Sequence, residues 1–286
     1  MKYYRLISIL VVVLILLIVF VNFIPSYNLF GPRSYKEPLE NELTFTNLVL
    51  YSKDEEYEKM YQLTQTYYKK FKNVTTIYYK YNENITNEFT VKGNILDIRG
   101  KETYVPGILE KTLRAFEFVA KNQFDYLIRS NISTIVNFDL LNDYLVENPI
   151  KYGGGLKNTI YQIDKDAGIV DDKYFGVQYA SGTSIIISKE TLDEILRFKD
   201  SIEKNFIDDV ALGILIDQDL GVVPKYVPVS RFISIPNENG DAAKIVELIK
   251  DKKYIFYRNR QPDRKTDVAQ MKVIIDHLLQ EKSLPS

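Results

Sequence analysis

The sequence predicts an α/β fold, in which a mainly parallel sheet is flanked by helices and follows one N-terminal transmembrane helix. Two observations predict it. Short β-rich apolar runs alternate with segments of helical periodicity through residues 43–286, and such alternation is typical of parallel sheets covered on both faces. The first thirty residues instead contain one long apolar run without charges. The 286 residues suffice for one large domain or two small ones.

The membrane candidate is residues 6–24, and its central part contains only Ile, Leu, Val and Phe. This length can cross a bilayer, and Lys2 and Arg5 before it predict a cytoplasmic N-terminus. A cleaved signal peptide is the alternative, although the small-x-small cleavage site is absent. We expect a single-pass type II protein whose main domain is lumenal or extracytoplasmic, in the Golgi or endoplasmic reticulum if the source is eukaryotic or viral. The expected parts are a cytoplasmic tip and signal anchor at 1–27, a stem at 28–42 and the domain at 43–286.

Strands are predicted where short runs of β-branched and aromatic residues lie between turn residues. In chain order these are residues 43–51, 74–81, 89–98, 124–129, 184–188 and 254–257, the third with a turn at Gly93-Asn94. Helices are predicted where apolar side chains recur every three or four residues. The first carries Tyr57 to Phe71, and Ser52 with Glu55 forms a capping-box pattern before it. The other helical candidates are residues 109–120, 138–146, 192–196, 210–215 and 268–278.

Composition excludes several classes of protein. Lys and Arg number 37 and Asp and Glu 38, so the chain lacks the basic field that non-specific nucleic-acid binding requires. Because there is no cysteine, disulfide scaffolds, thiol nucleophiles, zinc fingers and iron–sulfur sites are excluded. The single histidine, His277, lies beside a helical stripe and is expected to be half-buried and structural.

Four short motifs allow both a structural and a functional interpretation. The glycine run Tyr152–Gly155 lacks the spacing of a phosphate cradle, so a turn is the preferred interpretation. Ser181-Gly182 precedes a strand and forms either a tight turn or a close approach to a ligand. Asp208-Asp209 begin an apolar helix, where both could serve its N-terminus or one could be a general base.

The last motif is a late basic cluster. Arg258, Arg260, Arg264 and Lys265 follow the final apolar strand. Guanidinium groups match the geometry of phosphate oxygens, so the cluster could neutralise a diphosphate. A solvated loop is the alternative.

Several segments, taken in order, resemble the fringe-like β-1,3-glycosyltransferases. Residues 99–113 resemble the acidic-Ser-Tyr…Lys-Thr stretch of that family, and residues 124–130 resemble the strand that leads into its Asp-x-Asp metal site. Residues 179–188 resemble its Tyr-x-Ser-Gly-x-x-apolar-apolar-Ser signature. Residues 207–213 and 220–224 resemble its acidic-Asp-Val-x-x-Gly helix start and the Leu-Gly segment that follows.

The resemblance implies a GT-A fold and an inverting transfer of a sugar from a nucleotide sugar, with a UDP-sugar as the expected donor, to a hydroxyl of a glycan or glycoprotein. It assigns the catalytic base to Asp209, with Asp208 second. The residues that it places near the donor are Tyr51, Ser52, Glu102 and Tyr104, and Asn131 and Ser133 stand at its metal-site positions. Those that it places at the acceptor side of the cleft are Tyr179, Ser181 and Gly182. Our own hypothesis, which the resemblance does not imply, adds Arg129, Arg258, Arg260 and Arg264 as the cations available to neutralise the diphosphate.

The chain departs from this family at the metal site. Asn131-Ile132-Ser133 stand where the family has three aspartates, and its late histidine ligand is absent from the stretch around Tyr257. Neutral oxygens bind hard cations poorly, which argues against Mn²⁺ and suggests that arginines replace the ion. The alternative function is a catalytically degenerate GT-A-like membrane protein that binds a glycan or a partner glycosyltransferase. An unrelated nucleotide-binding membrane protein is disfavoured because no phosphate-loop motif is present.

Overall fold

The computed structural model describes residues 42–236 and 241–283. The predicted signal anchor at residues 6–24, and the stem as far as residue 41, lie outside the described residues. Within the described part, no helix combines the length and the apolar character needed to cross a membrane.

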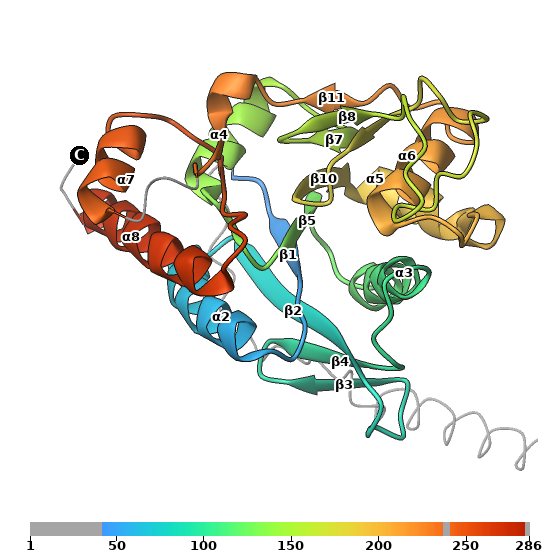
Figure 1. Ribbon diagram of the computed structural model, residues 1–286, viewed down its shortest axis with the longest axis horizontal. Coiled ribbons are helices and arrows are strands. Elements are labelled where there is room, and N and C mark those ends of the chain that lie inside the picture. Colours follow the sequence, from blue (N-terminus) through green and yellow to red (C-terminus); the bar gives the residue numbers. More distant parts are fainter. Residues whose placement is uncertain (1–41, 237–240, 284–286) are drawn as a thin grey trace, which may run out of the picture. The chain divides into compact units, whose positions relative to one another are not determined.

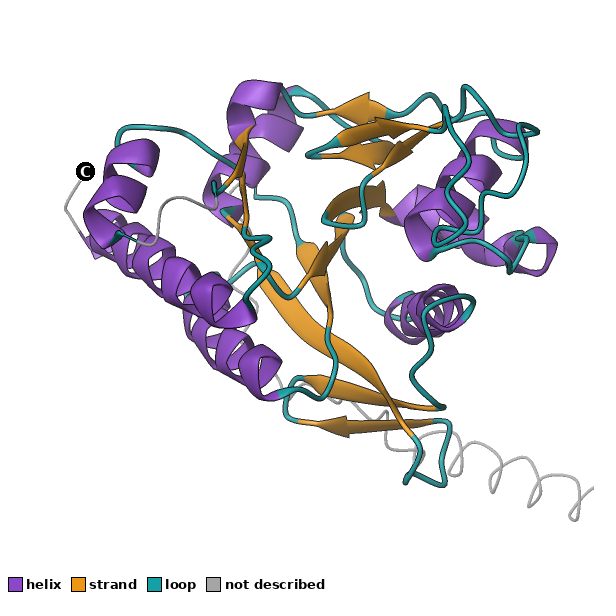
Figure 2. Ribbon diagram, viewed as in Figure 1, coloured by secondary structure: helices purple, strands orange, loops and turns teal. Residues whose placement is uncertain are grey.

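A mixed sheet runs through the centre of the described structure (Figures 1 and 2). The described residues place eight strands in it, in the order β11-β7-β10-β5-β1-β2-β4-β3. The four inner strands β5, β1, β2 and β4 are parallel, whereas β3 and β10 run antiparallel on either side of them. The strands are β1 Phe45–Leu50, β2 Val74–Asn82, β3 Phe89–Lys92, β4 Ile95–Arg99, β5 Tyr126–Asn131, β7 Tyr152–Gly154, β10 Ser184–Ser188 and β11 Lys225–Tyr226. The predicted α/β class with a mainly parallel central sheet is therefore confirmed.

Helices cover both faces of this sheet (Figure 1). One hydrophobic core joins the sheet to α2, α4, α7 and α8, and includes Met60, Phe138 and Ile274. A second core, on the opposite face, joins it to α3, α5 and α6, and includes Phe116 and Leu212. The helices are α2 Glu55–Tyr68, α3 Gly107–Val119, α4 Phe138–Glu147, α5 Lys189–Arg197, α6 Asp208–Gln218, α7 Ala242–Ile249 and α8 Arg264–Ser283.

Two small sheets complete the described part. Strands β8 (Lys157–Thr159) and β9 (Gln178–Ala180) form an antiparallel pair. Strand β13 (Phe256–Arg258) lies between β12 (Phe232–Ser234) and β6 (Thr134–Val136). In the antiparallel register of β13 and β6, Arg258 lies opposite Thr134. This pairing brings the late basic segment to the turn that follows β5.

Two local predictions differ from the structure. The glycine run does not form a turn, because Tyr152–Gly154 is strand β7, paired with β10 and β11. A side chain at Gly153 would collide with the Lys225 backbone carbonyl, so glycine permits this close strand approach. The α2 cap is Asp54, not Ser52, because the Asp54 carboxylate accepts from the backbone N–H of Glu56.

Candidate functional site

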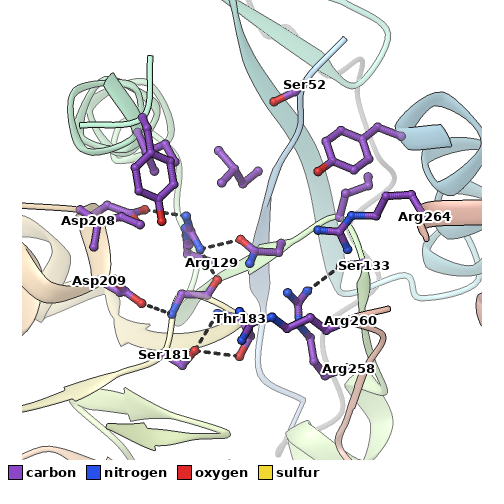
Figure 3. A pocket seen from close by; sticks show the side chains of 18 residues that line it. Ser52, Arg129, Ser133, Ser181, Thr183, Asp208, Asp209, Arg258, Arg260 and Arg264 are labelled. Carbon is purple, nitrogen blue, oxygen red and sulfur yellow. Dashed lines mark hydrogen bonds and ion pairs between the residues drawn. The ribbon is translucent and has the colours of Figure 1, made fainter. Parts of the chain in front are cut away.

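A cavity of about 490 Å³ lies beside the carboxyl ends of β1 and β5 (Figure 3). Its walls also come from the β5–β6 turn, the loop before β10, the start of α6, the end of β13 and the start of α8. Ligands of open parallel sheets bind at this kind of edge, because the strand ends and the adjoining loops converge there. The cavity is therefore the candidate functional site of the described residues.

The cavity brings together all but three of the site residues predicted from the sequence. Those that line it are Ser52, Tyr104, Arg129, Asn131, Ser133, Ser181, Gly182, Asp208, Asp209, Arg258, Arg260 and Arg264. The two aspartates lie at one side of the view in Figure 3, and Arg258, Arg260 and Arg264 lie at the other. The site thus has an acidic end and a basic end, with Arg129 between them.

Three assigned residues are not among the lining residues. The Tyr51 ring is buried, and its hydroxyl donates to the Glu58 carboxylate over 2.6 Å. Glu102 accepts a hydrogen bond from the Lys111 ammonium over 2.6 Å. Tyr179 lies on β9 against Gly213 of α6, where a larger residue would collide with its side chain.

Asp209 lies half-buried at the acidic end, in the first turn of α6. One carboxylate oxygen accepts from the Gly182 N–H over 2.8 Å and the other from the Val210 N–H over 2.9 Å. Burial raises the pKa of the Asp209 carboxyl to about 6, and the neighbouring Asp208 charge adds to this effect. The two hydrogen bonds and Arg129 act in the opposite direction. A carboxyl with this pKa can exchange a proton near neutral pH.

Asp208 has a different environment, although it is adjacent in sequence. Its carboxylate forms an ion pair with the Arg129 guanidinium over 2.6 Å, and both side chains are about 2% exposed. The Thr112 hydroxyl donates to the same carboxylate oxygen over 2.8 Å. Burial alone would lower the pKa of Arg129, but the Asp208 charge raises it above the ordinary value. The Asp208 carboxylate is thus engaged by the Arg129 ion pair and the Thr112 hydrogen bond. Asp209 is the more available of the two carboxylates for proton transfer.

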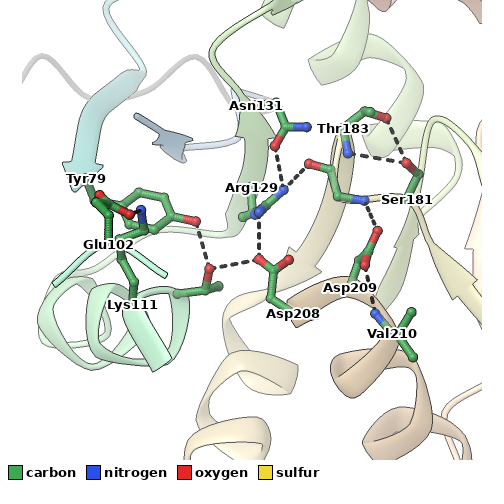
Figure 4. A network of polar contacts seen from close by, with 12 residues as sticks. Tyr79, Glu102, Lys111, Arg129, Asn131, Ser181, Thr183, Asp208, Asp209 and Val210 are labelled. Carbon is green, nitrogen blue, oxygen red and sulfur yellow. Dashed lines mark hydrogen bonds and ion pairs between the residues drawn. The ribbon is translucent and has the colours of Figure 1, made fainter. Parts of the chain in front are cut away.

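Arg129 contacts the carbonyl group of Gly182, and Asp209 contacts the N–H group of the same residue (Figure 4). The Arg129 Nη1 donates to the Gly182 carbonyl and, over 3.0 Å, to the Asn131 amide oxygen. Asp209 accepts from the Gly182 N–H. A Cβ atom at position 182 would lie 2.7 Å from Arg129 Nη1, so the arrangement requires glycine. The tight turn is confirmed, because the Ser184 N–H donates to the Ser181 carbonyl over 3.0 Å. The close approach observed at Gly182 is to a guanidinium group of the chain itself, and an approach to a ligand stays a prediction.

Arg258 is the central cation of the basic end. It is 8% exposed and donates to the Ser133 hydroxyl over 2.6 Å. Among the described residues, no carboxylate lies within ion-pair distance of Arg258, and its Nε has no hydrogen-bond partner. Burial lowers the pKa of Arg258 to about 10, and the charges of Arg264, Arg260 and Arg129 contribute. The side chain stays protonated at neutral pH, and a bound anion would relieve the repulsion.

The two other arginines of this end differ in their surroundings. Arg264 forms an ion pair with the buried Asp267 over 2.6 Å, and its guanidinium lies 5.8 Å from the centre of the Tyr57 ring. Arg260 is exposed at the cavity wall. Because Asp267 neutralises only Arg264, the basic end keeps an excess of positive charge. A diphosphate group carries the complementary charge.

The donor set at positions 131–133 does not fit a divalent metal ion. The Asn131 amide oxygen already accepts from Arg129, and the Ser133 hydroxyl accepts from Arg258. Within the described ranges, no cluster of three or more metal-ligating acidic or histidine side chains occurs. His277 lies on α8 and contacts Glu281 at 3.2 Å, so it supplies no ligand here.

Some cavity residues were not predicted. Thr183 directly follows the Ser181-Gly182 pair, and its hydroxyl donates to Ser181 over 3.2 Å. Tyr57 belongs to the apolar stripe of α2, and no local pattern distinguishes a ring that faces a cavity from one that faces the core. Ile108 and Ile207 contribute apolar wall from the starts of α3 and α6. Thr183 and Ile207 are each adjacent to a motif, and this adjacency is the signal that could have identified them.

Comparisons with known proteins give no family for this chain. No family model matches it, and no curated protein matches it. Among solved structures, the inositol-1-phosphate CTP transferase from T. maritima is similar, with a TM-score of 0.45 and 10% identity over 82% of this chain and 97% of that one. The glycosyltransferase GlyE of Streptococcus pneumoniae TIGR4 has a TM-score of 0.40 and 12% identity over 86% of this chain and 66% of that one. Both similarities are low in sequence identity and in TM-score.

Proposed function

We propose that this chain is a membrane-anchored, fringe-like glycosyltransferase with a GT-A-type fold. It transfers a sugar from a nucleotide sugar, with a UDP-sugar as the first candidate, to a hydroxyl of a glycan or glycoprotein, with inversion and without a metal ion. Residues 6–24 anchor it, with the domain on the lumenal or extracytoplasmic side. The observation that carries the proposal is one cavity with a proton-accepting carboxylate at one end and unneutralised arginines at the other.

The acidic end supplies the general base. The acceptor hydroxyl gives its proton to the Asp209 carboxylate while its oxygen attacks the anomeric carbon of the donor. With its pKa raised to about 6, Asp209 is ionised at neutral pH but is a better proton acceptor than an ordinary aspartate. Asp208 does not take this role, because its carboxylate is held by Arg129 and Thr112.

The basic end stabilises the leaving group. As the bond from the anomeric carbon to the phosphate oxygen breaks, its electron pair leaves with the nucleoside diphosphate. Arg258 and Arg260, which lack carboxylate partners among the described residues, are placed to neutralise this charge, with Arg264 beside them. Cations held in fixed positions stabilise a developing charge without reorganising, which is the work that a metal ion does elsewhere.

The test is a transfer assay on the full chain in detergent micelles. We expect one or more nucleotide sugars to release nucleoside diphosphate, at equal rates with Mn²⁺ and with EDTA. Asp209→Asn should lower this rate at least ~100-fold, the usual scale for loss of a general base. Asp217→Asn, an exposed site on the same helix, is the matched control and should keep the rate.

Binding separates the proposal from the degenerate alternative. A glycan-binding protein would show no turnover with any donor, and Asp209→Asn would leave its affinity for glycan unchanged. Turnover that EDTA abolishes and Mn²⁺ restores would contradict the metal-independent mechanism.

A further inference from the structure

A buried polar chain lies behind the acidic end of the cavity and reaches it from two other elements (Figure 4). The Tyr79 hydroxyl, on β2, lies 2.9 Å from the Thr112 hydroxyl, on α3. The Thr112 hydroxyl lies 2.8 Å from the Asp208 carboxylate, at the start of α6. All three residues are at most 1% exposed. Tyr79 and Thr112 do not line the cavity. The proposed transfer mechanism, with its base and its arginines, assigns no role to either residue.

The direction of hydrogen bonding in this chain is determined by its last member. An ionised carboxylate can only accept, so Thr112 must donate its single hydroxyl proton to Asp208. The Thr112 oxygen is then free to accept, and Tyr79 donates to it. Every hydroxyl proton therefore points toward Asp208. Hydrogen bonds aligned in this way polarise one another in a buried environment.

The chain continues from Asp208 into the cavity. Asp208 binds Arg129 Nη2 over 2.6 Å, and Arg129 Nη1 donates to the Gly182 carbonyl. The N–H of Gly182 in turn donates to Asp209. Asp208 is thus connected to Asp209, the proposed base, through one guanidinium and one glycine.

The opposite face of the sheet carries a matching pair that lacks this continuation. Tyr78 precedes Tyr79 on β2 and points to the other face, where its hydroxyl lies 2.8 Å from that of Thr64 on α2. The Thr64 hydroxyl donates over 2.9 Å to the Met60 carbonyl of its own helix. This pair ends in a backbone carbonyl, and among the described residues no charged side chain is hydrogen-bonded to either hydroxyl. The same strand therefore supplies an internal control for the Tyr79–Thr112 pair.

We propose that Tyr79 and Thr112 are positioning residues that fix the Asp208 carboxylate, and through it Arg129 and Gly182, in the geometry that aligns Asp209 for proton transfer. This inference rests on the proposed function. Tyr79 and Thr112 lie outside the cavity lining and therefore do not contact the substrate. Without the Thr112 hydroxyl, the buried carboxylate keeps only Arg129, the Arg129 side chain gains rotational freedom, and Asp209 loses its fixed neighbour at Gly182.

The first measurement is independent of catalysis. The Arg129 side-chain resonances are recorded in the ¹⁵N-labelled full chain in micelles and assigned by their loss in Arg129→Lys. We expect them to be sharp in the wild type, Thr112→Ser and Thr64→Val, and broadened or shifted in Thr112→Val. Tyr79→Phe should show a smaller change in the same direction, but the Tyr79 hydroxyl also interacts directly with Arg129, so this variant alone does not test the path through Asp208. Thr112→Ala, which also removes the hydroxyl, takes the place of Thr112→Val if that variant does not fold.

The second measurement is the split between kcat and KM. We expect Thr112→Val to lower kcat about tenfold or more, as for loss of a hydrogen bond to a charged group, with donor KM nearly unchanged. Thr112→Ser should restore kcat, whereas Thr64→Val and Tyr78→Phe should match the wild type. The positioning role is wrong if Thr112→Val shows the same Arg129 resonances and the same kcat as Thr64→Val. It is also wrong if the resonances and kcat of Thr112→Ser do not match those of the wild type. If the wild type itself turns over no donor, the proposed function fails. The Arg129 resonances alone then decide whether Tyr79 and Thr112 order Arg129 through Asp208.

Discussion

Replacing Asp209 with asparagine should change how the stability of the protein depends on pH. Folding raises the pKa of this carboxyl from 3.8 to about 6, chiefly because the charged form is desolvated. The folded state therefore binds its proton more tightly than the unfolded state does. The sign follows from this difference, since stability is highest below the unfolded pKa and falls as the pH rises through the folded pKa.

The magnitude follows from the same two pKa values. The shift of about two units corresponds to about 3 kcal/mol of unfavourable charging in the folded state. Between about pH 4.5 and about pH 7.5, roughly 2 kcal/mol of this is expressed, because the unfolded carboxyl is already mostly ionised at the lower value. Asparagine removes this contribution at every pH. It also removes one of the two oxygens that accept from Gly182 and Val210, so the pH slope is more informative than absolute stability.

The assay is urea unfolding of the full chain at both pH values. The free energy of unfolding of the wild type should fall by about 2 kcal/mol more than that of Asp209→Asn as the pH rises. Contributions from titrating groups that do not interact with Asp209 cancel in this difference. Asp276→Asn, at an exposed site on α8, should follow the wild type. Parallel pH dependence of the wild type and Asp209→Asn would refute the reasoning, because it would mean that Asp209 titrates alike in the folded and unfolded states.

Three further outcomes follow from the site. The pH profile of kcat/KM should rise with a midpoint near 6 and level off above it, and a midpoint near 4 would show that the essential base is an ordinary carboxylate. Arg258→Met should weaken binding of inorganic pyrophosphate by about tenfold or more in calorimetry. Lys265→Met, at an exposed site, should leave this binding unchanged, and equal losses in the two variants would argue against a specific anion site. Gly182→Ala places a methyl group 2.7 Å from Arg129 Nη1 and should destabilise the fold by about 1–3 kcal/mol in urea, and an unchanged midpoint would contradict the close packing.

Local patterns in the sequence identified most of the elements that position the site. Residues 43–51 and 184–188 were predicted as strands and form β1 and β10, because short β-rich apolar runs suit a buried sheet. Asp208-Asp209 were predicted at a helix start, which is where α6 begins. The small strands β6, β11 and β12 and the helix α7 were not predicted. The strands are too short to carry a periodic signal and are stabilised by long-range pairing, whereas the eight-residue α7 is stabilised by packing of Ile245 and Ile249 in the core.

The sequence by itself determined the alternation of strands and helices, and it placed the acidic pair and the basic cluster each at an element's end. These properties depend on neighbours a few residues apart, which share one strand or one helical turn. Only the tertiary structure decided that β13 pairs with β6 and so brings Arg258 to Ser133, that β7 is a strand, and that Thr112 meets Asp208. These contacts join residues about a hundred positions apart, and their geometry is set by packing of the whole sheet and its helices, which local spacing does not encode.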